Sequence, residues 1–264
     1  MTAVAAIAAL AGCGSEDRAA AQPDRRHITF RADDTSVTAP EQVPSGLVDI
    51  TLETAAGKQV HHIFVARLND GVSFEEAMAD EESFFTKMTI KGGNGVVAAG
   101  TRVEMTMNLE PGNYFVLDNP QNERSPTDTF TVVDGPRSTV EPEAKGTVHL
   151  GPGMSIHVPE GFDGRGVWKF VNDDPAESHE AALVRMKPGQ HAADVVEWFH
   201  AGDESAPPPF DGDFGSMGAL GPGETAWITL QPGEPGDYVL ICFVPGRDGI
   251  PHVGKGMVTD ITVE

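Results

Sequence analysis

Hydrophobic and polar residues alternate in short segments along most of the chain. Residues 48–52, 103–107 and 226–230 alternate with a period of two, which is the period of a half-buried β-strand. The 30 glycines and 20 prolines separate such segments and favour tight turns over long helices. Two segments favour a short helix, residues 73–84, which begin with capping-box spacing, and residues 192–199. The pattern predicts an all-β protein with two helical insertions.

The same motifs occur twice in the same order. A His, an apolar strand, an Arg and a Gly turn follow one another from His61 and again from His179. Val-Pro-x-Gly lies upstream of both copies, and a Gly-x-Tyr strand and a short apolar strand lie downstream. These matches predict a tandem duplication, with units 26–134 and 147–264 joined by a Pro-, Gly- and Glu-rich linker, 135–146. Short strands at regular intervals favour one β-sandwich for each unit, with one short helix in each.

Length and charge narrow the function classes. The 264 residues suit two domains, since a domain usually has roughly 100–200 residues. The chain carries 40 acidic and 18 basic residues, and its net charge is −22. This is the wrong sign for a protein that must neutralise phosphates, so we expect no nucleic-acid partner. A protein partner with a basic surface would be attracted by this charge.

The N-terminus indicates export. Residues 3–10 form an Ala-rich apolar run that is too short to span a bilayer, and residues 14–25 are mostly polar. The string ending in Cys13 resembles the bacterial lipoprotein box, although no Lys or Arg precedes it. The resemblance implies lipid on Cys13, with residues 1–25 serving as signal and tether, and a location at the extracytoplasmic face of the cell membrane. The alternative is a disordered Ala-rich tail. If Cys13 carries lipid, Cys242 has no disulfide partner.

The second unit carries a metal-binding pattern. A Gly-x-Tyr-x-x-x-Cys strand ends at Cys242, His252 and Met257 follow it, and His179 begins an earlier strand. This pattern resembles the copper-site signature of plastocyanin-like cupredoxins, which implies a Greek-key β-sandwich. It also implies one type 1 copper, with His179, Cys242 and His252 as equatorial ligands and Met257 as a weak axial ligand. Imidazoles and a thiolate are the donors that such copper prefers.

The first unit lacks this ligand set. Asp118 occupies the position of Cys242, and residues 119–129 contain no His and no Met. We therefore expect copper in the second unit alone. One feature leaves two alternatives: nine residues, 243–251, separate Cys242 from His252, which is more than in the plastocyanin-like pattern. Turn-forming pairs in this excursion can return His252 to Cys242 or hold it away.

These observations predict a membrane-anchored copper protein for single-electron transfer or copper handling, with a redox or copper-exchange protein as its partner. The alternative is a metal-free binding or structural module at the cell envelope. The chain has no His-x-His motif of the kind that builds the catalytic centres of multicopper enzymes, so we expect it not to be an enzyme.

The other chemistry-bearing residues have structural interpretations. Tyr238 resembles the tyrosine corner of sandwich domains. Adjacent strand residues point to opposite faces, so His61 and His62 do not form a chelating pair. Four further histidines have no ligand spacing and are expected at the surface: His149, His157, His191 and His200.

Overall fold

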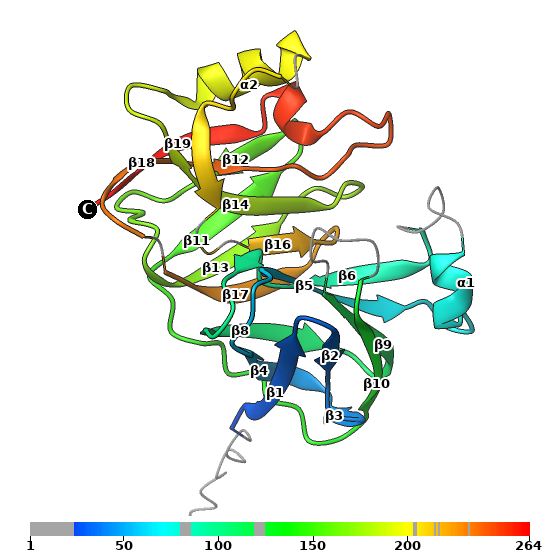
Figure 1. Ribbon diagram of the computed structural model, residues 1–264. Coiled ribbons are helices and arrows are strands. Elements are labelled where there is room, and N and C mark those ends of the chain that lie inside the picture. The colour runs from blue at the N-terminus through cyan, green and yellow to red at the C-terminus, as the bar shows by residue number, and fades with distance from the viewer. Residues whose placement is uncertain are drawn as a thin grey trace, which may run out of the picture.

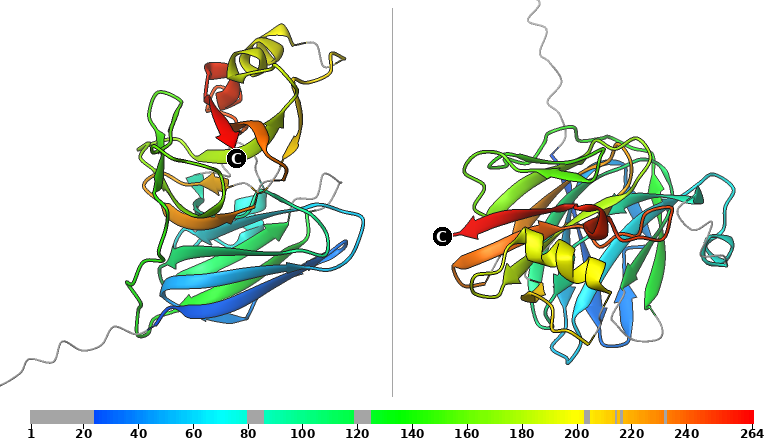
Figure 2. Two further views of the ribbon diagram at one scale, coloured as in Figure 1. Left: turned by 90° about the vertical axis from the view of Figure 1, so that its left-hand side faces the viewer. Right: turned by 90° about the horizontal axis from the view of Figure 1, so that it is seen from above.

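The computed structural model describes residues 24–79, 86–118, 125–202, 205–213, 215, 217–231 and 233–264. Within these ranges the protein is mostly β, and its second half stacks on its first (Figures 1 and 2). Cys13 lies outside the described residues, so its predicted lipid attachment stays a prediction. None of the described helices has the length and hydropathy needed to cross a bilayer.

The elements follow a similar order in both halves, except that β3 occurs in the first half alone and η2 in the second half alone among the described residues. The first half contains β1 (Arg26–Asp33), β2 (Ser36–Thr38), β3 (Gln42–Pro44), β4 (Gly46–Thr54), β5 (His61–Leu68), α1 (Phe74–Met78), β6 (Met88–Gly92), β7 (Val96–Val97), β8 (Arg102–Leu109), β9 (Gly112–Asp118) and β10 (Thr127–Val133). The second half contains β11 (Thr147–Gly151), β12 (Ser155–His157), β13 (Gly166–Asn172), β14 (His179–Met186), α2 (Ala192–Ala201), β15 (Phe210–Asp213), β16 (Met217–Leu220), β17 (Thr225–Leu230), β18 (Gly236–Ile241), the 3-10 helix η2 (His252–Lys255) and β19 (Val258–Val263).

Sheet pairing supports the duplication. One eight-stranded sheet has the order β12-β11-β13-β17-β8-β4-β1-β2. Its two halves mirror each other, because β12, β11, β13 and β17 correspond in the repeat to β2, β1, β4 and β8. The first half adds a six-stranded sheet through β3, β10, β9, β5 and β6, with β7 beside β5, and the second adds a five-stranded sheet through β15, β14, β18 and β19, with β16 beside β14. The two halves are therefore joined by one continuous sheet, which the sequence did not predict.

The junction of this sheet has local two-fold character. Strand β17 pairs antiparallel with β8, so that Met105 faces Ile228 and Met107 faces Ala226. These side chains are buried in the largest hydrophobic cluster, which also contains residues of all three sheets. Apolar burial on the inner side of β8 and β17 explains why neither strand is left as an exposed edge.

The elements predicted from the sequence occur close to their expected positions. Strand β4 covers residues 48–52, and helix α1 begins at Phe74, with Ser73 as its N-cap and both hydrogen bonds of a capping box. It ends at Met78, and residues 80–84 of the predicted helix lie outside the described residues. The second helix extends two residues beyond the predicted 192–199 and ends at Gly202 in the left-handed conformation. Both tyrosine corners are formed, because the Tyr114 hydroxyl donates to Glu110 O and the Tyr238 hydroxyl to Glu234 O.

Polar contacts link the halves beside the second-half site. The buried Lys91 ammonium on β6 contacts Glu110 of its own half at 2.8 Å and Glu224 of the other half at 2.5 Å. The backbone N–H of Gly218 on β16 donates to the carbonyl oxygen of Gly93. Because β16 pairs with β14, the first half supports the strand that begins with His179.

Candidate metal centre

Two neighbouring strands bring His179 and Cys242 together. Strands β14 and β18 pair antiparallel, with Ala182 opposite Ile241, and Cys242 follows the last residue of β18. His179 is the first residue of β14, so both side chains lie at one end of this pair. The N–H of Glu180 points at the Cys242 sulfur, 3.4 Å away, and fixes the thiol in the core. The resemblance to the cupredoxin signature implied this neighbourhood.

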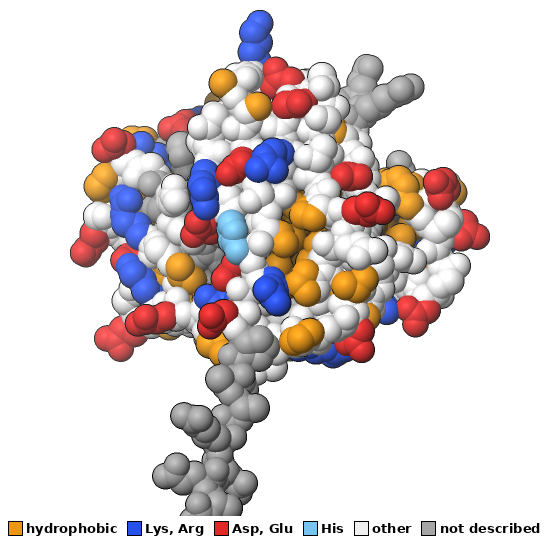
Figure 3. All heavy atoms as spheres, turned by 90° about the horizontal axis from the view of Figure 1, so that it is seen from below, with side chains coloured by type: hydrophobic (Ala, Val, Ile, Leu, Met, Phe, Trp, Pro, Cys, Tyr) orange, Lys and Arg blue, Asp and Glu red, His pale blue; other side chains and the backbone are white. Residues whose placement is uncertain are grey.

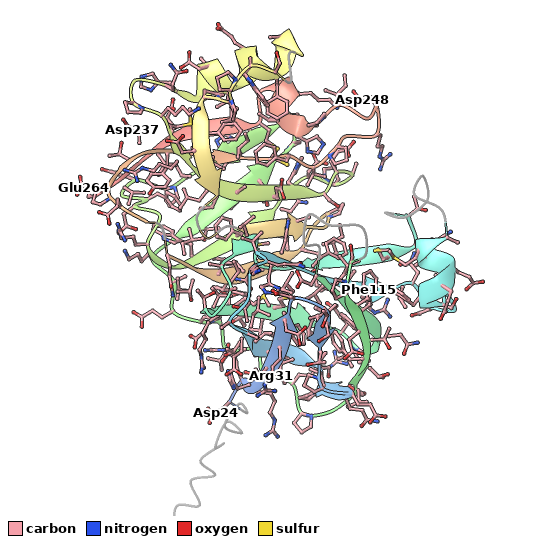
Figure 4. All side chains as sticks on the ribbon, in the orientation of Figure 1. Asp24, Arg31, Phe115, Asp237, Asp248 and Glu264 are labelled. Carbon is pink, nitrogen blue, oxygen red and sulfur yellow. The ribbon has the colours of Figure 1, made fainter. Side chains whose placement is uncertain are left out.

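The excursion between Cys242 and His252 folds back on itself. Pro245 and Pro251 form an isolated antiparallel bridge, and Gly246 N–H donates to Ile250 O at 2.9 Å. His252 N–H then donates to Val244 O at 3.0 Å, so the chain re-enters the fold beside the residue that it left. The structure thus selects the first alternative, in which His252 returns to Cys242. Asp248, at the tip of this excursion, is labelled in Figure 4.

Three donor atoms converge in the core. The Nδ1 atoms of His179 and His252 lie 3.0 Å apart, and the Cys242 sulfur lies 3.4 Å from His252 Nδ1. All three side chains are completely buried, and their donor atoms lie within 4.8 Å of one another. Two imidazoles and a thiol around one point form the equatorial donor set of type 1 copper, so the group fits this cofactor.

Met257 lies beside the same three residues. Its side chain is completely buried, and its backbone N–H donates to His252 O while its carbonyl accepts from Cys242 N–H. The turn that ends η2 therefore holds Met257 next to both His252 and Cys242. Its assignment as the axial ligand stays a prediction, because these contacts place its backbone and not its sulfur.

Burial keeps the donors uncharged at neutral pH. Desolvation, followed by the nearby Glu180 carboxylate, raises the pKa of the Cys242 thiol to about 12. Desolvation, followed by repulsion from His179, lowers the pKa of His252 to about 4, and desolvation lowers the pKa of His179 as well. A metal that binds here must displace the thiol proton, whereas both imidazoles already offer a lone pair.

The metal-free protein is therefore expected to lose stability as the pH falls from 6.5 to about 4. In this range the unfolded chain binds a proton on His252 that the folded protein does not bind, so protonation favours unfolding. The loss through His252 alone is on the order of 3 kcal/mol. Denaturant unfolding across this range measures it, and His252→Gln should flatten the slope. A slope unchanged by that substitution would contradict the assigned pKa.

Two carboxylates lie behind the imidazoles. Asp174 Oδ2 lies 3.5 Å from Nε2 of His179, and Glu177 Oε2 lies 4.0 Å from Nε2 of His252. Neither Nε2 has a hydrogen-bond partner within the described structure. An acidic group beyond the outer nitrogen favours a proton there and leaves Nδ1 free for a metal. Sequence reasoning missed both residues, although both lie in the acidic loop directly before His179.

The excursion covers the outer side of His252. A Cβ atom at Gly246 would lie 3.3 Å from His252 Nε2, so the backbone passes directly over the ring. Arg247 ties this cover to the loop before β14, because its Nη2 donates to Ala176 O and its Nε lies 3.7 Å from Glu177. The segment between Cys242 and His252, whose path the sequence left undecided, therefore shields His252 from solvent.

Within the described residues, the first half repeats the local geometry with an imidazole and a carboxylate in place of the thiol and two imidazoles. His61 Nδ1 contacts Asp118 Oδ2 at 2.5 Å, and His62 N–H donates to Asp118 Oδ1 at 3.0 Å. These are the counterparts of the His179–Cys242 neighbourhood and of the Glu180 N–H to sulfur contact. Asp118 therefore replaces Cys242 position for position. His61 and His62 do not share a ligand position, because only the His61 ring contacts Asp118.

The remaining histidines lie at the surface, as predicted. His149, His157, His191 and His200 are all exposed. His200 contacts the carbonyl oxygen of Gly254 at 2.6 Å and so connects α2 with η2.

Comparisons with known proteins found similarity among solved structures. No protein-family model and no curated protein matches the chain. Among solved structures, it is similar to a dithionite-reduced auracyanin from Roseiflexus castenholzii, with 26% identity over 46% of this chain and 99% of that one and a TM-score of 0.31. It is also similar to the copper nitrite reductase from Nitrosomonas europaea, with 14% identity over 91% of this chain and 94% of that one and a TM-score of 0.27.

A further likeness corrects one expectation. A multicopper oxidase matches with 12% identity over 90% of this chain and 89% of that one, at a TM-score of 0.26. Because two enzymes are among the structures that cover nearly the whole chain, the prediction that it is not an enzyme is wrong as a deduction from the sequence. The missing His-x-His motif does not exclude activity for a chain of this fold, and these low TM-scores assign none.

Proposed function

We propose that the chain is a type 1 copper protein that transfers single electrons at the extracytoplasmic face of the bacterial cell membrane. The convergence of His179 Nδ1, His252 Nδ1 and the Cys242 sulfur supports this most directly. Bound copper would supply a one-electron redox couple with a covalent bond to the thiolate. This one-electron couple would serve equally well in an electron-carrier protein and at the site where electrons enter an enzyme.

The surrounding residues hold the donors for this task. The Glu180 N–H stabilises a thiolate at Cys242, and the Glu180 carboxylate accepts from Phe243 N–H at 2.6 Å, which fixes the chain on both sides of the sulfur. The cover formed by residues 245–251 excludes water from His252. A rigid, dry donor set needs little rearrangement when an electron arrives, and this favours rapid transfer.

The remaining parts of the proposal rest on the sequence. Lipid on Cys13 would anchor the chain, and residues up to 25 would serve as its tether. The units 26–134 and 147–264 would be two Greek-key sandwiches of cupredoxin type, with 135–146 as the linker. A redox partner with a basic surface suits the net charge of −22. On the face shown in Figure 3, acidic and basic side chains are interspersed.

For the first unit we propose a metal-free structural role. Its buried His61–Asp118 pair occupies the place of the donors, and its Gly93 carbonyl and Lys91 side chain contact the second half. The first half would thus be a metal-free structural module, and the second half would bind the copper.

Copper titration tests the proposed function. The purified metal-free chain should bind Cu²⁺ at the buried centre and develop an intense visible absorption from thiolate-to-copper charge transfer, which ascorbate should bleach reversibly. Electron paramagnetic resonance should show the small copper hyperfine splitting of a type 1 site. Uptake of copper without visible colour, or no uptake, would contradict the proposal.

Replacing Asp174 by Asn should raise the reduction potential of the copper-loaded protein. The negative charge near His179 favours the more positive, oxidised state, and Asn keeps an oxygen acceptor for the turn N–H groups of Ala176 and Glu177. We expect a rise of tens of millivolts, where about 59 mV is a tenfold change for one electron. Redox titration of the visible band measures it. Asp163→Asn, where the carboxylate pairs with Lys145, is the control. An equal shift in both variants would refute the role of Asp174.

A further inference from the structure

Two exposed histidines face each other across the outermost strand pair of the second half. Strands β11 and β12 pair antiparallel at the end of the eight-stranded sheet, and their register places His149 directly opposite His157. Their neighbours Leu150 and Ile156 are buried, so alternation directs both imidazoles to the solvent side. Directly opposite residues have Cβ atoms about 4.5–5.5 Å apart. At this separation, one nitrogen of each exposed imidazole can reach a common ion.

A carboxylate already orients one of the two rings. Asp173 Oδ2 contacts His149 Nδ1 at 2.7 Å, with both side chains about half exposed. This contact places the proton on Nδ1 and leaves Nε2 as the free acceptor. Metal-binding histidines in proteins usually donate one ring N–H to a carboxylate and bind the metal through the other ring nitrogen. Asp173 is itself held, since its N–H donates to Leu150 O at 2.8 Å.

Gly151 shares the exposed face of this strand pair with His149 and His157. The neighbouring Gly151 has no side chain, and a Cβ placed there would lie 3.9 Å from the His157 ring and 3.0 Å from the Ser155 hydroxyl. The His157 ring therefore lies close to Gly151, on the same face of the strand pair as His149. The excess of acidic residues favours cations over the whole surface.

We propose that His149 and His157 form a second, surface site for a divalent transition metal, with Asp173 as the residue that positions His149. Imidazole donors suit copper, nickel and zinc, and the order of affinities for such donors favours Cu²⁺. The site is independent of the buried centre in its residues. It adjoins that centre in the chain, since Asp174, next to Asp173, lies 3.5 Å from the His179 ring.

Metal titration of a chain without the buried thiol tests this site. Cys242→Ser removes the sulfur donor, and the probe is Cu²⁺ alone, followed by calorimetry and electron paramagnetic resonance. The variant should bind Cu²⁺ with a resonance signal from nitrogen ligands and a large hyperfine splitting, and without the visible band. Adding His149→Ala or His157→Ala should each remove this binding, and adding Asp173→Asn should weaken it by about tenfold or more.

The exposed His191 is the matched control, because it lies at the start of α2 and has no histidine partner in strand pairing. His191→Ala in the same background should leave Cu²⁺ affinity unchanged. Equal losses in the His191 and His157 variants, or binding that survives both strand substitutions, would overturn the proposal. All four histidine and aspartate changes are at exposed positions, and circular dichroism verifies that the variants fold. Failure of this site would not affect the assignment of the buried centre. The buried centre is read by its visible absorption, whereas the surface site is read by calorimetry and electron paramagnetic resonance in a variant without that absorption.

Discussion

Replacement of Cys242 by Ser is expected to abolish the visible absorption of the copper-loaded protein. Only the thiolate supplies the charge-transfer band, and a serine hydroxyl at the same buried position is a weak ligand that stays protonated. Copper affinity at the buried centre should fall by several orders of magnitude with it. The measurement is the absorption spectrum during Cu²⁺ titration, with copper content determined after removal of weakly bound metal.

The duplication provides a matched control. Asp118→Ser makes the corresponding change in the first unit, where the carboxylate holds His61 and the described residues contain no group of three metal donors. It should lower the free energy of unfolding, because it leaves a buried imidazole without its partner, and it should leave the visible band at full intensity. Loss of colour in the Asp118 variant, or persistence of colour in the Cys242 variant, would contradict the assignment of copper to the second half.

Replacement of Gly93 by Ala is expected to destabilise the whole protein by about 4 kcal/mol or more. A Cβ at this position would overlap the carbonyl oxygen of Ile63 on β5, which is backbone and cannot rotate away. The Gly93 carbonyl also accepts the hydrogen bond from Gly218 on β16. A shift of this segment therefore disturbs both the first half and the strand that pairs with His179.

Chemical denaturation of the metal-free protein measures this loss, with Gly135→Ala as the control. A Cβ at Gly135 meets no atom within 4 Å, and its backbone is not in the left-handed region, so its free energy of unfolding should change little. If the Gly93 and Gly135 variants unfold at the same denaturant concentration, the close approach of Gly93 to the Ile63 carbonyl does not contribute to stability as inferred.

Much of the candidate site was predictable from the sequence. The repeat aligned His61 with His179 and Asp118 with Cys242, which assigned the expected donors to the second unit alone. The resemblance of the His, Cys, His and Met pattern to the cupredoxin signature implied that His179, His252 and Met257 surround Cys242. The pairing of β14 with β18 and the backbone contacts of Met257 with Cys242 and His252 agree with that placement.

Other features depend on contacts that no local pattern encodes. The return of His252 depends on the bridge between Pro245 and Pro251, and turn residues alone were compatible with either path. The pairing of β8 with β17 joins edges of two units, and alternation within each strand does not name its partner. Asp174 and Glu177 read as ordinary loop residues until the fold brings them behind the imidazoles.

X-ray absorption spectroscopy of the copper-loaded chain tests the central claim most directly, because it reports the atoms bound to the metal. We expect one short sulfur contact and two imidazole nitrogens around copper, with the sulfur contact absent in Cys242→Ser. A shell composed only of nitrogen and oxygen in the unaltered chain would contradict it.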